Sequence, residues 1–389
     1  MAIGELVSGM VERIAAGGAG VLTVQGKRVF MEGAAPGDRV TGRITVENRR
    51  WDRAELVELA EASPLRATPF CPLYGSCGGC SLQHLAYEAQ LAEKARILRD
   101  AFTRLGDIPL PGEVPFVPSP PMEYRNRIQL HRKEALVGFK ARKSDEIIPI
   151  KDCPAADPSL RAVLQEGSAL PPPGKDRFTL YGRGDTLVSE GSIRGKTVRR
   201  GTVRLGGKEI RMDAGVFFQS NGIMLEKLIA DLSSIAANAD TRRGPTVLPM
   251  VDLYCGVGTF AAFLGEKFPR VDLVEENPEA IVLARENVRG METRLFAQTG
   301  DLWVKGCTGI DGYGFMVADP PRQGLSPALR RALAQKGPPM LAYVSCDPAT
   351  LARDSGELLA GGYRLERLMG YDFYPQTAHI ESLAVFVRL

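Results

Sequence analysis

Hydrophobic and polar residues change their pattern several times along the chain. Residues 1–62 contain short alternating stretches broken by glycine, which predict a small β-barrel. A segment rich in proline, glycine and cysteine covers 63–80, and apolar residues at helical spacing in 87–105 then predict one amphipathic helix. Short strand-like runs with turns return over 124–212. They predict a second, mostly β module.

From Phe217 onward, apolar strand-like runs alternate with helical runs. The strand-like runs each end at a polar position and cover 247–254, 271–275, 315–319 and 340–345. This alternation predicts an α/β domain with a largely parallel sheet, whose ligands bind at the carboxyl ends of the strands. We therefore expect three units, at 1–62, 63–212 and 213–389, with the helix at 87–105 free to pack on the last of them.

The composition indicates the class of protein and its location in the cell. The 389 residues are 44% apolar and 24% charged, as in an ordinary globular protein. No run of about 18 apolar residues occurs, and Glu5, Glu12 and Arg13 interrupt the start of the chain where a signal peptide would be apolar. We therefore expect a cytoplasmic protein that does not associate with membranes.

Charge is unevenly distributed, although the net charge of +3 is too small to indicate a nucleic-acid partner. Residues 120–215 hold 19 lysines and arginines against 12 aspartates and glutamates, while residues 1–62 hold 8 against 9. A basic middle segment can contact phosphates, because electrostatic contacts dominate nucleic-acid affinity. A solvated surface would explain the charge count equally well.

The clearest ligand-binding pattern is a strand that runs into a glycine turn and then a helix, in Val251-Asp-Leu-Tyr-Cys-Gly-Val-Gly-Thr-Phe260. A dinucleotide fingerprint needs a third glycine three residues after Gly258, and Ala261 stands there. Glu275 ends the next strand, where its carboxylate can accept hydrogen bonds from ribose hydroxyls. The pattern fits a nucleoside cofactor such as S-adenosylmethionine better than a dinucleotide, although a tight packing turn would also explain the glycines.

Cys346 ends a strand in Leu341-Ala-Tyr-Val-Ser-Cys-Asp-Pro348. Asp347 is a good N-cap and Pro348 a good first helical residue, so Cys346 should directly precede a helix. We expect the positive end of that helix to lower the pKa of the thiol. A lone buried cysteine is more often an inert apolar residue. The polar neighbours and the strand-end position favour a reactive thiol here.

A thiolate is what methylation at carbon 5 of a pyrimidine requires. Carbon 5 is a poor nucleophile until a thiolate adds to carbon 6 and pushes electron density onto it, after which it can take a methyl group from a sulfonium. A base must then remove the carbon 5 proton so that the thiolate can leave. His379 and Glu381, just before the final apolar strand, are both chemically suited to be this base, and both could equally be surface loop residues.

With these residues in place, the chain resembles the bacterial RNA 5-methyluridine methyltransferases, in particular the 23S ribosomal RNA branch that carries an iron-sulfur cluster. The resemblance covers nearly the whole chain through these motifs: Cys71-x5-Cys77-x2-Cys80, Tyr124-Arg-Asn-Arg-Ile128, Phe217-Phe-Gln-Ser-Asn221, Asp252-Leu-Tyr-Cys-Gly256, Asp319-Pro-Pro-Arg322, Ser345-Cys-Asp-Pro348 and His379-Ile-Glu381. It implies an α/β protein with a TRAM-like or OB-like barrel at 1–62, a mostly β iron-sulfur and RNA-contacting module at 63–212, and a Rossmann-like class I methyltransferase domain at 213–389.

Carried over by position, the resemblance implies Cys346 as the nucleophile and Glu381, in preference to His379, as the base. It implies that four residues surround S-adenosylmethionine, with Asp319 also close to the target base: Gln219, Tyr254, Glu275 and Asp319. The sequence departs from the family pattern near Thr259 and over 298–301, so the adenine contacts stay open.

Seven cysteines in a reducing compartment make a disulfide framework improbable. Four of them have the spacing of a metal site, and by spacing alone they could hold zinc or a four-iron cluster: Cys71, Cys77, Cys80 and Cys153. The resemblance implies a 4Fe-4S cluster, and Cys255 and Cys307 are then packing residues. Methyl transfer is not a redox reaction. We therefore expect the cluster to be a structural staple, which holds the central module together and shapes the RNA surface.

The expected activity is therefore transfer of a methyl group from S-adenosylmethionine to carbon 5 of a uridine in RNA, most readily 23S ribosomal RNA, by a monomer. The alternatives are a methyltransferase for the T loop of tRNA, whose branch generally lacks both the barrel and the four cysteines, and a non-catalytic RNA-binding or ribosome assembly factor. A DNA cytosine-5 methyltransferase is disfavoured because Ser345, not proline, precedes Cys346. A redox protein would leave the α/β domain unexplained. The sequence does not specify which uridine is modified.

Overall fold

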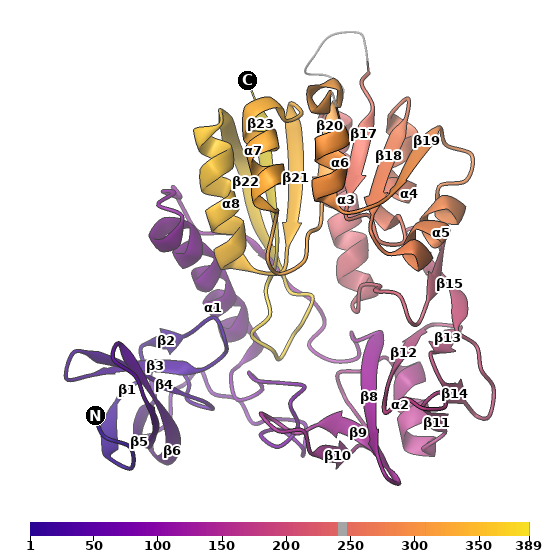
Figure 1. Ribbon diagram of the computed structural model, residues 1–389. Coiled ribbons are helices and arrows are strands. Elements are labelled where there is room, and N and C mark those ends of the chain that lie inside the picture. The colour runs from indigo at the N-terminus through magenta and orange to yellow at the C-terminus, as the bar shows by residue number, and fades with distance from the viewer. Residues whose placement is uncertain (240–246, 308, 389) are drawn as a thin grey trace.

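The computed structural model describes residues 1–239, 247–307 and 309–388, which form three regions (Figure 1). The largest is an eight-stranded sheet in the order β19-β18-β17-β20-β21-β23-β22-β7. Its strands are β7 (Phe116–Val117), β17 (Met250–Leu253), β18 (Val271–Glu275), β19 (Thr293–Ala297), β20 (Phe315–Ala318), β21 (Met340–Ser345), β22 (Tyr363–Tyr371) and β23 (Glu381–Arg388). Strands β17 to β21 are mutually parallel, and β23 inserts antiparallel between β21 and β22. The predicted α/β architecture with a largely parallel sheet is present.

Helices cover both faces of this sheet. One face carries α3 (Gly222–Ala239), α4 (Thr259–Leu264) and α5 (Pro278–Asn287), and the other carries α1 (Tyr87–Asp100), α6 (Gly300–Gly306), α7 (Pro327–Lys336) and α8 (Pro348–Ala360). Short helical turns are also present among the described residues: η1 (Ala101–Leu105), η3 (Gly265–Lys267) and η4 (Ile310–Gly312). Every residue of β17, β20 and β21 is buried, as expected for parallel strands covered on both sides.

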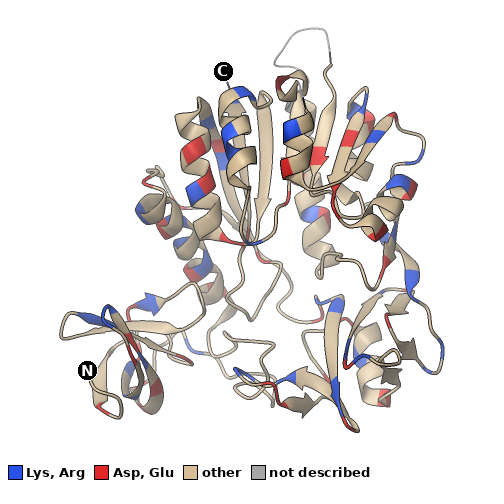
Figure 2. Cartoon of the chain, in the orientation of Figure 1, with Lys and Arg blue, Asp and Glu red and all other residues tan. Residues whose placement is uncertain are grey.

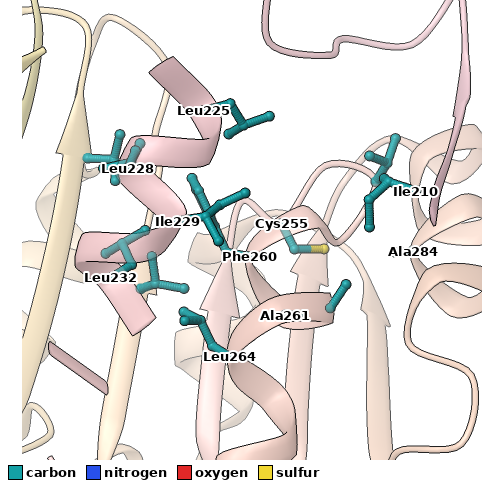
Figure 3. Packing of buried hydrophobic residues seen from close by; sticks show 14 of the residues in the cluster. Ile210, Leu225, Leu228, Ile229, Leu232, Cys255, Phe260, Ala261, Leu264 and Ala284 are labelled. Carbon is teal, nitrogen blue, oxygen red and sulfur yellow. The ribbon is translucent and has the colours of Figure 1, made fainter. Parts of the chain in front are cut away.

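Helical periodicity builds the first of these two cores. Leu225, Leu228, Ile229 and Leu232 recur at helical spacing in α3 and belong to one apolar cluster with Phe260 and Leu264 of α4, and Figure 3 labels these residues on the two helices. Cys255 lies in the same apolar cluster, and Cys307 packs against the cluster on the opposite face of the sheet. Both cysteines are therefore packing residues, as expected.

The strand order creates a crevice at one edge of the sheet. From β17 the chain proceeds outward through β18 and β19, then crosses back to β20 and continues through β21 in the other direction. Leu253 and Ala318, the last residues of β17 and β20, are paired in register. In open parallel sheets, ligands bind where the strand order reverses, outside the carboxyl ends of the strands. The loops after β17 and β20 are therefore where a ligand is expected.

The N-terminal region is a six-stranded sheet in the order β1-β5-β6-β4-β3-β2 (Figure 1). Its strands are β1 (Leu6–Met10), β2 (Arg13–Ile14), β3 (Gly20–Val24), β4 (Lys27–Met31), β5 (Arg39–Glu47) and β6 (Trp51–Glu61). Strand β1 also lies beside β3, so the sheet curls around an apolar core that includes Val29, Met31 and Val40. This curled sheet occupies the range in which we expected a barrel.

The central region contains a five-stranded sheet, β10-β9-β8-β12-β13, a two-stranded sheet of β11 and β14, and the β15–β16 hairpin. Its elements are β8 (Arg127–Lys133), β9 (Leu136–Lys140), β10 (Ile147–Pro149), α2 (Pro158–Glu166), β11 (Ala169–Leu170), β12 (Arg177–Arg183), β13 (Thr186–Ser189), β14 (Ser192–Ile193), β15 (Arg200–Leu205) and β16 (Lys208–Asp213). Val203, Ile210 and Met212 belong to the apolar cluster of α3 and α4. The α/β core thus begins before residue 213.

Helix α1 ends at Asp100, and a π-helical turn, η1, covers the rest of the predicted helical segment. Leu98 and Phe102 pack in one cluster with Leu351 of α8, so this segment lies on the α/β region. None of the described helices is both long and apolar enough to cross a membrane.

The basic excess of the central segment serves internal contacts in part. Figure 2 shows both signs of charge on all three regions. Arg199 pairs with Glu279, Lys208 with Glu266, and Arg211 with Glu286. These pairs join the β15–β16 hairpin to α5 and η3, so they hold the hairpin against the α/β region. The charge count alone therefore overstates the surface that is free to contact phosphates.

Candidate active site

One cleft of about 580 Å³ gathers every residue predicted for catalysis and cofactor binding in the α/β region. These residues come from segments far apart in the chain: Gln219, Tyr254, Glu275, Asp319, Cys346 and Glu381. They meet because β17, β18, β20 and β21 end at the same edge of the sheet and β23 begins there. The predicted crevice is therefore lined by the predicted residues.

The glycine loop forms one side of the cleft. Tyr254, Gly256 and Gly258 all have positive φ, of 63°, 54° and 76°. A Cβ at Gly258 would lie 3.1 Å from Ala284, so glycine also lets the loop approach α5 closely. Glu275 accepts hydrogen bonds from the backbone N–H groups of Gly256 (3.0 Å) and Asn277 (2.8 Å). Each carboxylate oxygen keeps a second lone pair that can accept from a ribose hydroxyl.

Asp252 lies just before the glycine loop and binds the start of the helix that follows it. The sequence indicated no separate role for this residue. One oxygen accepts from the N–H of Ala261 at 2.9 Å, and the other has no hydrogen-bond partner among the described residues. Burial, followed by the negative charges of Asp319 and Glu275, raises the pKa of Asp252 to about 8. The carboxyl therefore carries its proton at neutral pH.

Strand pairing places Cys346 beside Glu381 at the reaction side of the cleft. Strands β21 and β23 are antiparallel, and Ser345 is paired with Ser382. Cys346 directly follows Ser345 and Glu381 directly precedes Ser382, so the two residues adjoin this last pair, and the charge of Glu381 acts on the Cys346 thiol. Asp347 caps α8 by accepting from the N–H of Thr350 at 2.8 Å, and Pro348 begins the helix. The predicted strand end and helix start are confirmed.

The predicted direction of the Cys346 pKa was wrong. Burial, followed by the negative charges of Glu381 and Asp319, raises the pKa of Cys346 to about 11, and the opposing effect of Arg322 is smaller. The cap residue Asp347 also satisfies one of the N–H groups of α8 that would otherwise face the thiol. The free thiol is therefore protonated at neutral pH, and a partner must take its proton.

Asp319 and Glu381 are two carboxyl groups buried in the same cleft. Burial raises the pKa of Asp319 to about 7, although Gln219 donates a hydrogen bond to it at 3.5 Å. Burial and the charge of Asp319 raise the pKa of Glu381 well above its usual range. Oε1 of Glu381 has no hydrogen-bond partner among the described residues. Both carboxyl groups therefore hold a proton more readily than exposed carboxyl groups do, which suits them to accept and return protons in acid–base catalysis.

His379, the other candidate base, lies at the exposed rim of the cleft. Its Nδ1 is 3.3 Å from Nη2 of Arg322. Partial burial, followed by the positive charges of Arg322 and Arg125, lowers the pKa of His379 to about 4. The pKa of His379 is lowered and that of Glu381 is raised, so the two shifts favour Glu381 as the base.

Two further residues of the cleft had no role assigned from the sequence. Tyr374 lines the cleft and packs its ring against that of His379, with centroids 5.6 Å apart. Arg125 also lines the cleft. Arg125 could have been found because it lies in the Tyr124-Arg-Asn-Arg-Ile128 motif, whereas nothing in the sequence around Tyr374 marks it.

The four cysteines of the predicted metal site line a second, smaller cavity: Cys71, Cys77, Cys80 and Cys153. Arg125 lines both this cavity and the catalytic cleft. Burial and the neighbouring thiols raise the pKa of Cys80 to about 11, while Gln83 and Arg125 oppose the rise. Within the described ranges, no group of three or more His, Cys, Asp or Glu side chains is arranged to hold a metal ion.

The pKa of Cys346 predicts how its alkylation depends on pH. Because the thiolate is the reactive form, the rate with iodoacetamide should rise roughly tenfold per pH unit between about pH 7 and pH 10. Glu381→Gln removes a negative charge that disfavours the thiolate, so it should raise the rate at pH 9. Mass spectrometry of the Cys346 peptide measures this rate separately from the other cysteines. A rate that is already constant above pH 8 would contradict the raised pKa.

Comparisons with known proteins point to one class of enzyme. A model of the tRNA (Uracil-5-)-methyltransferase family matches residues 308–388. The 23S rRNA (uracil(1939)-C(5))-methyltransferase RlmD of Chromohalobacter salexigens is 32% identical over 97% of this chain and 88% of its own. An uncharacterized RNA methyltransferase of Treponema denticola is 31% identical over 93% of this chain and 94% of its own.

A solved structure matches along the whole chain. The tRNA (uracil-54, C5)-methyltransferase of Pyrococcus abyssi, in complex with S-adenosyl-L-homocysteine, superposes with a TM-score of 0.74 at 26% identity. The match covers 98% of this chain and 100% of that one. It confirms the predicted α/β methyltransferase fold.

Proposed function

Since the chain belongs to the family of S-adenosylmethionine-dependent RNA uracil-C5 methyltransferases, we propose that it methylates a uridine of 23S ribosomal RNA through a covalent adduct to Cys346. The observation that carries the mechanism is the cleft in which Cys346 lies beside Glu381, with Asp319 close by. A thiol and two buried carboxyl groups at the strand ends supply the nucleophile and the bases that pyrimidine C5 methylation needs.

The proposed reaction begins with a proton leaving the Cys346 thiol. Because the pKa of the thiol is about 11, the Asp319 carboxylate takes this proton as sulfur bonds to carbon 6, which leaves Glu381 free to act as the later base. The electrons of the carbon 5–carbon 6 double bond then move toward carbon 5 and the O4 carbonyl. Bound S-adenosylmethionine supplies an electrophilic methyl group and a positive charge that lowers the pKa of nearby acids.

The second half of the reaction regenerates the enzyme. Carbon 5 then carries both the new methyl group and its original proton. Glu381, as a carboxylate, removes that proton, the double bond re-forms, and the Cys346–carbon 6 bond breaks as sulfur takes back the proton held by Asp319. Oε1 of Glu381, which has no hydrogen-bond partner among the described residues, is suited to receive the proton. Gln219, Tyr254 and Glu275 line the same cleft and are proposed to hold the cofactor.

Ribosomal RNA is the preferred substrate because several relatives that match most of this chain are 23S rRNA (uracil(1939)-C(5))-methyltransferases. The Pyrococcus abyssi enzyme, named for tRNA, matches 98% of this chain and therefore extends through the N-terminal region. The presence of that region does not separate the two substrates, contrary to our expectation. Methylation of tRNA thus remains the second candidate.

A labelling experiment tests the substrate. The protein is incubated with methyl-labelled S-adenosylmethionine and either unmodified ribosomal RNA or unmodified transfer RNA, and mass spectrometry then maps the methylated nucleotide. We expect 5-methyluridine in 23S ribosomal RNA. Label in transfer RNA alone would overturn the ribosomal assignment, and label on another base would overturn the proposed chemistry.

We further propose that Cys71, Cys77, Cys80 and Cys153 hold a 4Fe-4S cluster. The four cysteines line one cavity and would supply the four thiolate ligands that such a cluster requires. Arg125, whose charge favours the thiolate forms of Cys77, Cys80 and Cys153, would offset part of the negative charge.

The cluster is expected to be a structural staple, because Cys153 is distant in sequence from the other three ligands. Cys80→Ala should lower the iron content and the thermal unfolding temperature, and weaken RNA binding. Cys307→Ala, which lies outside this cavity, is the matched control and should keep its iron. Iron analysis, thermal unfolding and RNA titration measure the three effects. Unchanged folding and RNA affinity in Cys80→Ala would refute the staple.

A further inference from the structure

The loop over 372–379 joins β22 to β23 and leads directly into Glu381. In Figure 1 it extends from the sheet toward the two smaller regions. It carries Tyr374 and His379 to the cleft. Strand pairing fixes Ser382 against Ser345, but no hydrogen bond to another described residue holds Oε1 of Glu381. Glu381 is also paired with Tyr371 of β22, so the sheet fixes its backbone, and the preceding loop supplies Tyr374 and His379 around its carboxyl group.

A reciprocal pair of hydrogen bonds ties this loop to α1. Nε2 of Gln90 donates to Oε1 of Gln376 at 2.9 Å, and the N–H of Gln376 donates to Oε1 of Gln90 at 3.0 Å. Nε2 of Gln90 also donates to the carbonyl of Leu85 at 3.0 Å. Both glutamines are buried, with exposures of 0% and 4%. A buried amide pair of this kind is costly to break, because each unpaired group loses its partner without regaining water.

The segment after Cys80 also binds Gln376, through different atoms. The N–H groups of Ser81 and Leu82 both donate to the carbonyl of Gln376, at 2.8 and 2.9 Å. Oγ of Ser81 accepts from the N–H of Ala378 at 3.1 Å. Ile380, next to Glu381, packs in an apolar cluster with Leu82. The cysteine-bearing segment thus contacts the loop on both sides of His379.

Gln376 is also strained, with φ at +66°. A non-glycine residue in the left-handed region costs on the order of 1 kcal/mol, and it persists only where its surroundings fix it. Four hydrogen bonds to Gln376, from Gln90, Ser81 and Leu82, supply this constraint. Losing them would let the backbone relax, which would shift the residues that lead to Glu381.

We propose that Gln90 and Ser81 are positioning residues that hold the 372–379 loop so that Glu381 can remove the carbon 5 proton. The inference rests on the proposed function, because it takes Glu381 as the base. Cys346 lies on the β21–α8 connection and not on this loop. Loss of the hydrogen bonds that Gln90 and Ser81 make to this loop therefore slows breakdown of the covalent adduct more than its formation.

The test compares variants of the full-length protein. Gln90→Leu removes the amide at similar volume, and Ser81→Ala removes only the acceptor for Ala378. Glu88→Gln, at an exposed position of the same helix, is the control. We expect kcat to fall by about 10- to 100-fold for Gln90→Leu and less for Ser81→Ala, with KM for RNA changing by less than about threefold. Denaturing gels should show labelled RNA covalently attached to both variants.

Glu381→Gln separates the possible failures. If Glu381→Gln accumulates no adduct, the assignment of Glu381 as the base fails. If Glu381→Gln accumulates adduct while Gln90→Leu loses activity without it, the positioning role fails. Thermal unfolding shows whether Gln90→Leu is folded. If Gln90→Leu does not fold, Ser81→Ala alone decides. Accumulation of the adduct in Ser81→Ala supports the positioning role, and absence of the adduct overturns it.

Discussion

Cys346→Ala is expected to reduce methyl transfer to RNA by at least about 10,000-fold. Without the Cys346 thiol the cleft loses its nucleophile, and carbon 5 stays too electron-poor to take the methyl group. Cys255 also lines the cleft, but it is buried in the apolar cluster of α3 and α4 and is not expected to replace Cys346. Glu381 and Asp319 are bases, and as carboxylates they cannot replace a thiolate as the nucleophile of this addition. Transfer of labelled methyl groups to RNA, measured under single-turnover conditions, gives the rate.

The structure offers a control for this prediction. Cys307→Ala alters a thiol that packs against the core and does not line the catalytic cleft, so its rate should stay within about twofold of the unaltered protein. Binding of S-adenosylmethionine to Cys346→Ala should be retained, because the cofactor residues come from other strands. A Cys346→Ala protein that still methylates uridine at carbon 5 would exclude the covalent mechanism.

The sequence predicted the α/β fold and the meeting of the site residues for one physical reason. Parallel strands carry their carboxyl ends to one edge, so polar residues at consecutive strand ends must meet there. Glu275, Asp319 and Cys346 could thus be placed together from the alternation of strands and helices alone. Glu381 needed the resemblance, because nothing in its local pattern shows that its strand inserts antiparallel beside β21.

Properties that depend on distant neighbours could not be predicted. The pKa of Cys346 was expected to be lowered by α8, but the carboxyl groups that raise it belong to segments after β20 and at the start of β23. Tyr374 reaches the cleft only because α1 and the segment after Cys80 hold its loop. The charge count of the central segment likewise did not show that Arg199, Lys208 and Arg211 pair with the α/β region.

Lys94→Met is expected to destabilise the protein by about 3–5 kcal/mol, a large share of the stability of a typical domain. Lys94 and Asp372 form an ion pair of 2.6 Å with exposures of 1% and 0%. Nζ of Lys94 also donates to the carbonyl of Tyr374 at 3.0 Å. Methionine fills similar volume but leaves a buried carboxylate whose one remaining side-chain partner among the described residues is the hydroxyl of Tyr87. Urea unfolding measures the loss.

The double variant Lys94→Met/Asp372→Asn separates the buried charge from the lost packing. An asparagine carries no charge and still accepts the hydrogen bond of the Tyr87 hydroxyl, so the double variant should recover more than half of the lost stability. Arg99→Met, at an exposed position of the same helix, should change stability by less than about 0.5 kcal/mol. If the two substitutions at the pair add instead of compensating, the cost of Lys94→Met arises from the contact with Tyr374 and not from the unpaired charge of Asp372.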